Sequence, residues 1–469
     1  MKYDMKLFNS LSRKVEEFIP LSDNKVGMYT CGPTVYQPTS IGNFRTYTMS
    51  DILHRVLLLN GYDVNYIMNI TDVGHLTGDN LGDSSQGEDR LEAASKKEGR
   101  NAQEIADYYS ESFKSDYKKL NLIPPTKWVR ATDYITDQIS LIKILEDKGY
   151  TYRITDGIYF DTGKCHRYGE LSTLDKIKEG ARVDINPEKK NPRDFALWKF
   201  SVPEEKRQQE WASPWGTGFP GWHIECSAMS MKYLGPTFDI HVGGEDLRGT
   251  HHPNEIAQSE AATGRKFVNY WVHISFLLID GGKMSKSLGN AYSLDDLEER
   301  GYNASALKYL FLSAHYRSNL NFTFDSLGAA DTNIKRIKQF IIQNSGSPTF
   351  EDIKDYSNTH IRKFTDALND DLDTPKALVE LNAVVKGTLP IQEKLTTLHI
   401  FDDTLGLGLF DDTKKDLKID PEIEMLIRDR EKARKLKNWK AADLIRKRIE
   451  DKGYVLRDTS TGSDPEERK

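Results

Sequence analysis

The chain has no long apolar segment. No hydrophobic run approaches the roughly 20 residues that span a bilayer, and the N-terminal MKYDMKLFNS lacks the apolar core of a signal peptide. Internal repeats and low-complexity segments are also absent from the sequence. With 38% hydrophobic and 29% charged residues, the composition is that of a globular protein. We therefore expect a cytoplasmic protein that does not bind a membrane.

Cysteine is scarce. The three cysteines, Cys31, Cys165 and Cys226, are an odd number and lie far apart. This spacing argues against a disulfide framework and leaves metal ligands, catalytic thiols or incidental thiols. Around Cys165, in DTGKCHRYGEL, no second ligand lies at metal spacing, which favours an inert loop thiol.

Excess positive charge is lacking as well. The net charge of −6 means that the whole chain has no basic field to attract nucleic acid. Residues 425–452 are a local exception, because they contain 11 Lys/Arg and 5 Asp/Glu, a balance of +6. Either a solvated helical face or a contact with an RNA backbone would explain this stretch.

Strand and helix patterns alternate over the first two thirds of the chain. Residues 26–30 and 64–70 are predicted strands around a helix at 43–61, which makes one βαβ unit. A polar loop is expected at 74–87, before a helix at 88–98. Further predicted elements are helices at 101–120, 133–148, 253–263 and from 293 onward, a hairpin at 150–161, and strands at 238–242 and 270–279.

No strand pattern follows Phe324. Helices are predicted at 329–344, 360–369, 375–385 and 390–397, and residues 421–469 are predicted to form a helical hairpin with a short tail. The fold class is therefore α/β, with a parallel-sheet core followed by an all-helical C-terminal region. A length of 469 residues predicts roughly three domains.

Two stretches suit phosphate binding. In TCGPTVYQPTSIGNFR, residues 30–45, a helix that begins near the SIGN run would turn its free N–H groups and positive dipole end toward a bound phosphate. The second stretch, KMSKS at 283–287, follows two glycines and carries two ammonium groups and two hydroxyls. Such a loop suits a developing pyrophosphate charge, although an exposed basic turn is the alternative.

A metal site is suggested by two thiols, an imidazole and a carboxylate. His251 and Glu255 lie four positions apart on a predicted helix and therefore share one face. Cys226, after a strand-like WHIEC, and Cys31 would complete a tetrahedral zinc set. Either cysteine by itself is more often a buried small apolar side chain than a metal ligand. His252 is a rival ligand, expected about 100° around the helix from the Glu255 face.

Taken together, SIGN after a strand and KMSKS after two glycines resemble the class I aminoacyl-tRNA synthetases. The segments GWHIEC, HHPNE and FLSAHYRSNLNF narrow the resemblance to the cysteinyl-tRNA synthetases, over nearly the whole chain. The resemblance implies a Rossmann-like core, a mixed connective-peptide insertion and an all-helical anticodon-binding region. The implied ranges are 1–113 and 209–270 for the two halves of the core, 114–208 for the insertion, 271–328 for the KMSKS loop and stem-contact region, 329–415 for a helical bundle, and 416–469 for a small anticodon-binding end.

The resemblance also implies the activity and the residues that carry it. Cysteine would be activated with ATP, with Mg²⁺ accompanying the ATP, and transferred to tRNA(Cys) by a monomer. The implied zinc ligands are Cys31, Cys226, His251 and Glu255; the amino acid would meet Gly32, Thr71, Trp222, His223 and Asp246. ATP would meet Thr34, Tyr36, Gly42, Asn43, Lys283, Ser285 and Lys286, with Ser40, Asn43, Lys283 and Lys286 in catalytic roles.

The sequence departs from the family pattern in three places. Ser40 and Asn43 replace the two histidines of the family's HIGH-type motif, a polar loop at 74–87 interrupts the run after Ile-Thr-Asp, with residues 88–90 resuming it, and the tail TSTGSDPEERK lacks an aromatic-basic ending. Serine cannot carry an imidazolium charge. Two other functions therefore stay open: a ligase that joins cysteine to a small amine, and a catalytically weakened RNA-binding relative.

Overall fold

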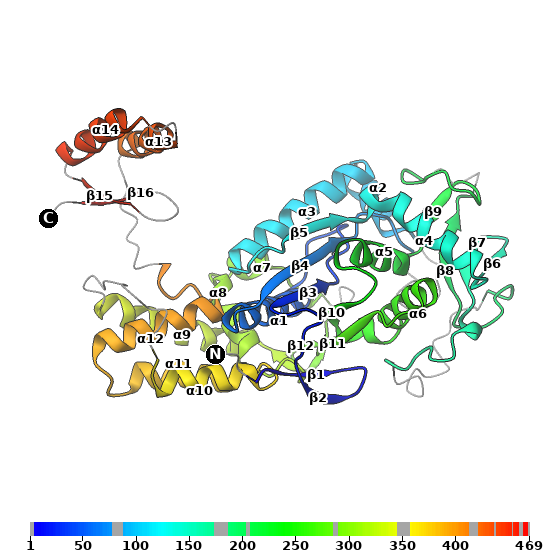
Figure 1. Ribbon diagram of the computed structural model, residues 1–469, viewed down its shortest axis with the longest axis horizontal. Helices are drawn as coiled ribbons and strands as arrows, with labels where there is room; N and C mark the ends of the chain where they lie inside the picture. The colour runs from blue at the N-terminus through cyan, green and yellow to red at the C-terminus, as the bar shows by residue number, and fades with distance from the viewer. Residues whose placement is uncertain are drawn as a thin grey trace. The chain divides into compact units, whose positions relative to one another are not determined.

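Figure 1 shows the computed structural model of the chain. The structure describes residues 4–76, 88–172, 186–202, 207–284, 289–344, 357–411, 421–435, 438–452, 454–458 and 463–467. The chain divides into two compact units, Met1–Leu409 and Phe410–Lys469. The second unit begins six residues before the range 416–469 expected for the C-terminal end.

The first unit is built on a parallel sheet of five strands. Their order is β11 (Val268–Ile274), β10 (Phe238–Gly244), β3 (Lys25–Thr30), β4 (Asp63–Ile70) and β5 (Lys127–Arg130), and every neighbouring pair is parallel. Helix α1 (Ile41–Leu59) connects β3 to β4 and packs on β4 and β10. The predicted α/β class with a parallel sheet is therefore confirmed.

Helices α5 (Trp222–Leu234) and α6 (His251–Thr263) pack against each other beside the sheet (Figure 1). The prediction of a strand at WHIEC is wrong, because this run is the first turn of α5. Ile224, Cys226 and Met229 are all buried in the core. A short run that is buried on most sides shows no amphipathic period, so its pattern does not separate helix from strand.

A second, antiparallel sheet takes three of its strands from the expected insertion, 114–208, and the fourth, β9 (Gly218–Pro220), from the range 209–270 expected for the core. Its order is β6 (Thr151–Ile154), β7 (Gly157–Phe160), β8 (Phe195–Phe200) and β9, and the β6–β7 pair is the predicted hairpin. The expected range 114–208 also overlaps the parallel sheet, because β5 lies within it. Preceding helices are α2 (Arg90–Glu98), α3 (Ala102–Lys119) and α4 (Ile135–Asp147). Most of the predicted polar loop, residues 77–87, lies outside the described residues.

The apolar run 270–279 is two strands rather than one. It covers the end of β11 and β12 (Leu277–Ile279), and β12 belongs to a small sheet with β13 (Gly282–Lys283) and β14 (Leu320–Phe322). Helices α7 (Leu294–Glu298) and α8 (Ala304–Leu312) follow, and the N-terminal hairpin is β1 (Lys6–Asn9) with β2 (Lys14–Glu17). The predicted helical region is confirmed as α9 (Phe324–Asn344), α10 (Thr359–Asn369), α11 (Thr374–Lys386) and α12 (Ile391–Leu405).

The second unit contains the predicted helical hairpin, α13 (Pro421–Lys435) and α14 (Trp439–Asp451). The expectation that no strand follows Phe324 is wrong, because β15 (Tyr454–Asp458) and β16 (Ser463–Glu467) form an antiparallel pair. Leu456 of β15 is buried with Ile423 and Ile449 of the helices. β15 has only one short apolar run, Tyr454–Leu456, and β16 has a proline and three acidic residues, so the pair gives little periodic signal from which to predict strands.

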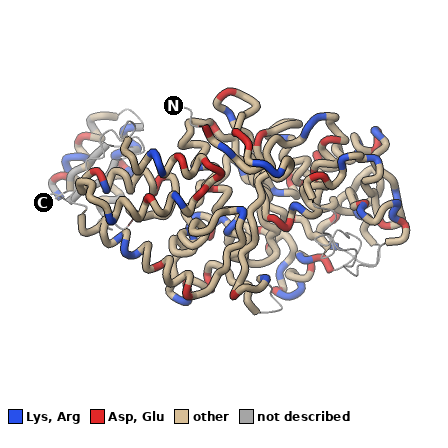
Figure 2. Tube along the Cα trace, turned by 90° about the horizontal axis from the view of Figure 1, so that it is seen from below, with Lys and Arg blue, Asp and Glu red and all other residues tan. Residues whose placement is uncertain are grey.

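Charge is mixed over the molecule. Figure 2 shows basic and acidic residues interspersed along the trace, as the small net charge leads one to expect. No helix in the described ranges is long and apolar enough to cross a membrane.

A buried ion pair ties α1 to the helices that follow the sheet. Lys308 Nζ of α8 lies 3.0 Å from Asp51 Oδ2 of α1, and neither side chain is exposed. Asp51 also accepts from Arg55 Nε at 2.8 Å, and Arg55 donates to the backbone carbonyl of Asp403 at the end of α12. Burial lowers the pKa of Lys308 to about 8, although Asp51 opposes that shift.

We predict that Asp51→Asn destabilises the first unit by about 3 to 5 kcal/mol, because it leaves the Lys308 ammonium buried without its counter-charge. Urea unfolding followed by tryptophan fluorescence measures the loss. Lys119→Ala is the matched control, since Lys119 pairs with Asp295 and Glu298 at 3.0 and 2.8 Å but is 35% exposed. That variant should lose no more than about 1 kcal/mol. Equal losses in the two variants would contradict the prediction.

Candidate active site and metal centre

The candidate site lies where the strand order of the parallel sheet reverses. β3 pairs with β4 on one side and with β10 on the other, which is the position where open α/β sheets bind ligands. Cys31 directly follows β3, and its N–H donates to the Val242 carbonyl of β10 at 3.1 Å. A cavity of about 220 Å³ opens beside Cys31 and is lined also by Asn43, Trp222 and Asp246.

Gly32 lets the chain after Cys31 approach β4 closely. Its N–H donates to Asn69 Oδ1 at 2.8 Å, and a Cβ at this position would lie 1.7 Å from the Asn69 carbonyl oxygen. Only glycine fits so close to a backbone carbonyl. The contact fixes the first residue after the thiol against the neighbouring strand.

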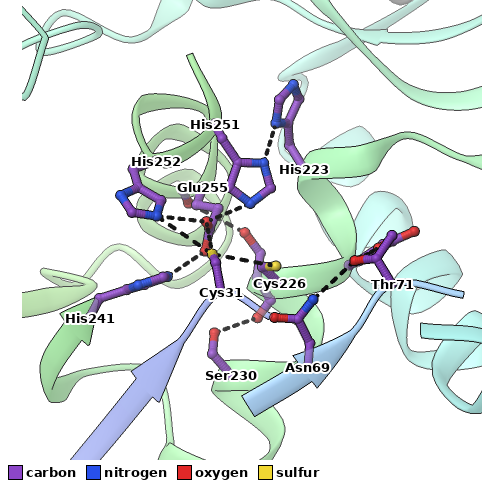
Figure 3. Close-up of polar contacts among 12 residues, drawn as sticks. Cys31, Asn69, Thr71, His223, Cys226, Ser230, His241, His251, His252 and Glu255 are labelled. Atoms are coloured by element: carbon purple, nitrogen blue, oxygen red, sulfur yellow. Dashed lines mark hydrogen bonds and ion pairs between the residues drawn. The ribbon is translucent and has the colours of Figure 1, made fainter. Parts of the chain in front are cut away.

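The four predicted metal ligands come together from distant parts of the chain (Figure 3). The donor atoms of Cys31, Cys226, His251 and Glu255 lie within 4.8 Å of one another, and all four residues are buried. Cys31 Sγ is 3.9 Å from Cys226 Sγ and 3.8 Å from Glu255 Oε1. His251 Nε2 is 3.0 Å from the same carboxylate oxygen.

The charges of this cluster depend on one another. Burial alone would raise the pKa of Glu255, but the His241 and His251 imidazoles outweigh it and lower that pKa to about 2. Burial opposes protonation of His251, yet Glu255 and Cys226 raise its pKa to about 10. Burial and then the second thiol raise the pKa of Cys31, whereas the hydrogen bond from Cys31 lowers the pKa of Cys226 to about 7.

The donor set fits a zinc ion. Tetrahedral zinc, with sulfur at about 2.3 Å and nitrogen or oxygen at about 2.0 to 2.2 Å, keeps neighbouring ligand atoms roughly 3.3 to 3.8 Å apart. The distances from Cys31 Sγ to Cys226 and Glu255 are close to this range. Two thiols, an imidazole and a carboxylate also match the ligand preference of a borderline-soft cation.

The expectation that His252 lies about 100° around the helix from the Glu255 face is wrong. Its Nε2 atom lies 3.5 Å from Cys31 Sγ and 4.0 Å from Glu255 Oε1. Three residues along a helix turn by 300°, so His252 sits about 60° from Glu255 on the side opposite His251. Both histidines therefore face the same carboxylate.

Several polar residues of the site were not predicted from the sequence. Among them, His241 Nε2 lies 2.9 Å from Glu255 Oε2. His223, which was predicted, has its Nδ1 atom 2.9 Å from His251 Nδ1. His241 stands with Asp239 inside the otherwise apolar strand run FDIHV, and an ionisable residue in a buried strand is the signal that could have found it. Under the cavity, Glu225 accepts from Thr71 Oγ1 at 3.2 Å and pairs with His75 at 2.7 Å.

Helix α1 begins at the other end of the cavity. Ser40 is its N-cap: Ser40 Oγ accepts from the Asn43 N–H at 3.3 Å and donates to Asn43 Oδ1 at 2.6 Å. The chain after the lysine loop runs alongside, because the Ile41 N–H donates to the Tyr292 carbonyl at 2.9 Å. Met284 of KMSKS lies against Gly42, where an added Cβ would be 3.2 Å from Met284 Cε.

The structure gathers many of the residues expected at the site around one cavity. Those in its lining are Cys31, Gly32, Thr34, Tyr36, Asn43, Trp222 and Asp246, and the lining residues that were not expected are Pro33, Gln37, Pro38, Thr39, Thr46, Tyr47, Arg90, Gly244 and Leu247. Ser40, Gly42, Thr71, His223 and Lys283 are not in the lining, and Ser285 and Lys286 lie outside the described residues. Cys165 joins no metal-donor group among the described residues, and burial raises its pKa to about 11.

Comparison with known proteins identifies the class. Residues 17–332 match the family model for the catalytic domain of class I (C) tRNA synthetases, and the chain belongs to the class I aminoacyl-tRNA synthetases. Residues 416–463 match the anticodon-binding domain of cysteinyl-tRNA ligases. The chain is a member of the cysteinyl-tRNA synthetase family.

Two curated relatives extend this likeness over nearly the full length. Cysteine–tRNA ligase 1 of Burkholderia lata is 46% identical, covering 97% of this chain and 95% of the relative. The cysteine–tRNA ligase of Treponema denticola is 41% identical, covering 97% and 98%.

Solved structures share the fold. A Mycobacterium tuberculosis methionyl-tRNA synthetase in complex with methionyl-adenylate has a TM-score of 0.54 at 13% identity, over 84% of this chain and 92% of that one. An Agrobacterium radiobacter leucyl-tRNA synthetase, in a ternary complex with tRNA, has a TM-score of 0.58 at 12% identity, over 85% and 86%. At such identities the likeness concerns the fold alone.

Proposed function

We propose that the chain joins cysteine to tRNA(Cys) in two steps. Cysteine and ATP form cysteinyl-adenylate and pyrophosphate, and the cysteinyl group then passes to the terminal adenosine of the tRNA. The observation that carries this proposal is the buried set of two thiols, an imidazole and a carboxylate beside a cavity that also contains Asn43 of α1. The names of the two curated relatives support the same activity.

Selectivity for cysteine is assigned to the metal ligands. Cys31, Cys226, His251 and Glu255 would hold a zinc ion, which supplies when bound a soft Lewis acid that favours a thiolate over a hydroxyl. Serine differs from cysteine by a single atom, so the shape of a pocket can separate the two by only about 1 to 3 kcal/mol. The ligand residues thus supply a chemical distinction that packing cannot.

The remaining residues would position the two substrates. The Trp222 ring lies 4.3 Å from the His251 ring and walls the cavity, and the Asp246 carboxylate suits the ammonium group of an amino acid. Gly32, Thr71 and His223 would support this pocket. Thr34, Tyr36, Gly42 and Asn43 would meet ATP together with Lys283, Ser285 and Lys286, and Mg²⁺ would accompany the phosphates.

The two other functions raised by the sequence have less support. A ligase acting on a small amine would have no need of an anticodon-binding domain, which residues 416–463 match. A weakened RNA-binding relative would have no need of a complete buried donor set. A cytoplasmic location and a monomeric state stay predictions.

The direct test is cysteine-dependent exchange between ATP and pyrophosphate, followed by charging of a tRNA(Cys) transcript. We expect exchange with cysteine and an exchange rate at least 100-fold lower with serine. The shape of the pocket would supply about 1 to 3 kcal/mol of this discrimination, and the preference of the metal for a thiolate would supply the rest. Exchange without charging of tRNA(Cys), but with transfer to a small amine, would support the amine ligase instead. Absence of exchange in zinc-loaded protein would support the RNA-binding relative.

Ser40 allows a sharper prediction. Because Ser40 caps α1 and bonds Asn43, Ser40→His should cost about 1 kcal/mol of stability and should not raise the exchange rate. Ser40→His/Asn43→His, which restores both imidazoles, should be faster than the single variant. Ser40→Ala controls for loss of the cap alone. Rates and thermal midpoints of the four proteins decide the matter, and a several-fold gain in Ser40→His by itself would refute the prediction.

Zinc retention tests the ligand assignment. We expect about one zinc per chain in the purified protein, and a content well below that in Cys31→Ala, since Cys31 Sγ lies between the other donors. Cys165→Ala is the matched control, because that thiol lies outside the cluster. Elemental analysis after dialysis measures both, and full zinc in Cys31→Ala would exclude the assignment.

A further inference from the structure

The buried site contains a second complete set of metal donors. Donor atoms of Cys31, His241, His252 and Glu255 lie within 4.8 Å of one another, just as those of Cys31, Cys226, His251 and Glu255 do. We name these four the rear set and the proposed zinc ligands the front set. Figure 3 shows His241 and His252 on one side of Cys31 and Glu255, with His251 and Cys226 on the other.

The two sets face different surroundings. In the front set, His251 contacts Trp222, which lines the cavity together with Cys31. In the rear set, the His241 and His252 rings pack at 4.6 and 4.9 Å from the ring of Trp271, a buried core residue. An ion in the front set would therefore adjoin the cavity, whereas an ion in the rear set would be enclosed by the sheet and α6.

His252 is held as a metal-binding histidine usually is. Its Nε2 atom points to Cys31 Sγ at 3.5 Å, and its Nδ1 atom is 2.8 Å from His273 Nε2. His273 Nδ1 is in turn 2.8 Å from Ser10 Oγ. A hydrogen bond at the second ring nitrogen orients an imidazole toward a metal. A Cβ at Gly243 would lie 2.5 Å from His252 Cε1, so β10 has a glycine where this ring must fit.

His241 completes the rear set. Its Nε2 atom lies 2.9 Å from Glu255 Oε2, whereas His251 of the front set contacts the other carboxylate oxygen, Oε1. Among the described residues, His241 Nδ1 is buried and has no hydrogen-bond partner. Unlike His252, His241 is therefore oriented by its contact with Glu255 and by its packing on Trp271 rather than by a hydrogen bond at its second ring nitrogen.

We propose that the rear set is a second position for the metal ion. One thiolate, two imidazoles and one carboxylate form a tetrahedral set suited to zinc. Because Cys31 and Glu255 belong to both sets, a single ion occupies one position or the other. This inference rests on the zinc site proposed above. It predicts that loss of a front-set ligand moves the ion to the rear set instead of releasing it.

Zinc content and X-ray absorption of the full-length protein test the proposal. Wild type should show two sulfur ligands and one imidazole. Cys226→Ala and His251→Ala should each keep about one zinc, now with one sulfur and two imidazoles, and should lose cysteine-dependent exchange. His251→Ala is the decisive variant, since both thiols remain and only a move of the ion lowers the sulfur count. It also decides the matter if Cys226→Ala does not fold.

Two controls complete the experiment. His252→Ala should keep the wild-type spectrum, and Cys226→Ala/His252→Ala, which damages both sets, should hold far less zinc than Cys226→Ala. Zinc-free Cys226→Ala, or His251→Ala with two sulfur ligands, would overturn the second position and leave the proposed function standing. Wild type without zinc would instead overturn the zinc site itself, and the second position with it.

Discussion

The Glu255 carboxylate is the group on which the site depends. It is fully buried, and it contacts a thiol and three imidazoles that come from β3, β10 and α6. An isolated carboxylate at this depth would be far too costly to keep ionised. The His241 and His251 imidazoles lower its pKa, and Glu255 in turn raises the pKa of His251. Glu255 thus joins β10 and α6 through its contacts with His241 and His251.

The metal donors could be predicted from the sequence because residue types that bind zinc occur at spacings that helix and strand geometry bring together. His251 and Glu255 share a helix face by simple geometry, and Cys31 follows a strand whose apolar run is unmistakable. The three-residue spacing from His252 to Glu255 also makes these residues neighbours on the helix surface, so the same geometry predicts that contact. The prediction of a strand at WHIEC was wrong because a run that is buried on most sides has no hydrophobic period that distinguishes a helix from a strand.

Other features depend on tertiary contacts that no local pattern contains. His241 meets Glu255 only because β10 and α6 pack together, and Glu225 meets Thr71 across 154 positions of sequence. The split of the apolar run 270–279 into two strands depends on where the small sheet pairs with β14. The strand pair of the second unit likewise forms because Leu456 finds a helical surface to cover.

Helix α1 fixes the distance between the cavity and the last turn of α12. Its first residue follows the N-cap Ser40 beside the cavity, and Arg55, 14 residues beyond Ile41, donates to the Asp403 carbonyl in the last turn of α12. At a rise of 1.5 Å per residue, this part of the helix is about 21 Å long. The separation between the cavity and the last turn of α12 therefore depends on the number of residues in α1 between Ile41 and Arg55. Inserting or deleting one residue would change both that length and, by about 100°, the direction in which Asp51 and Arg55 point.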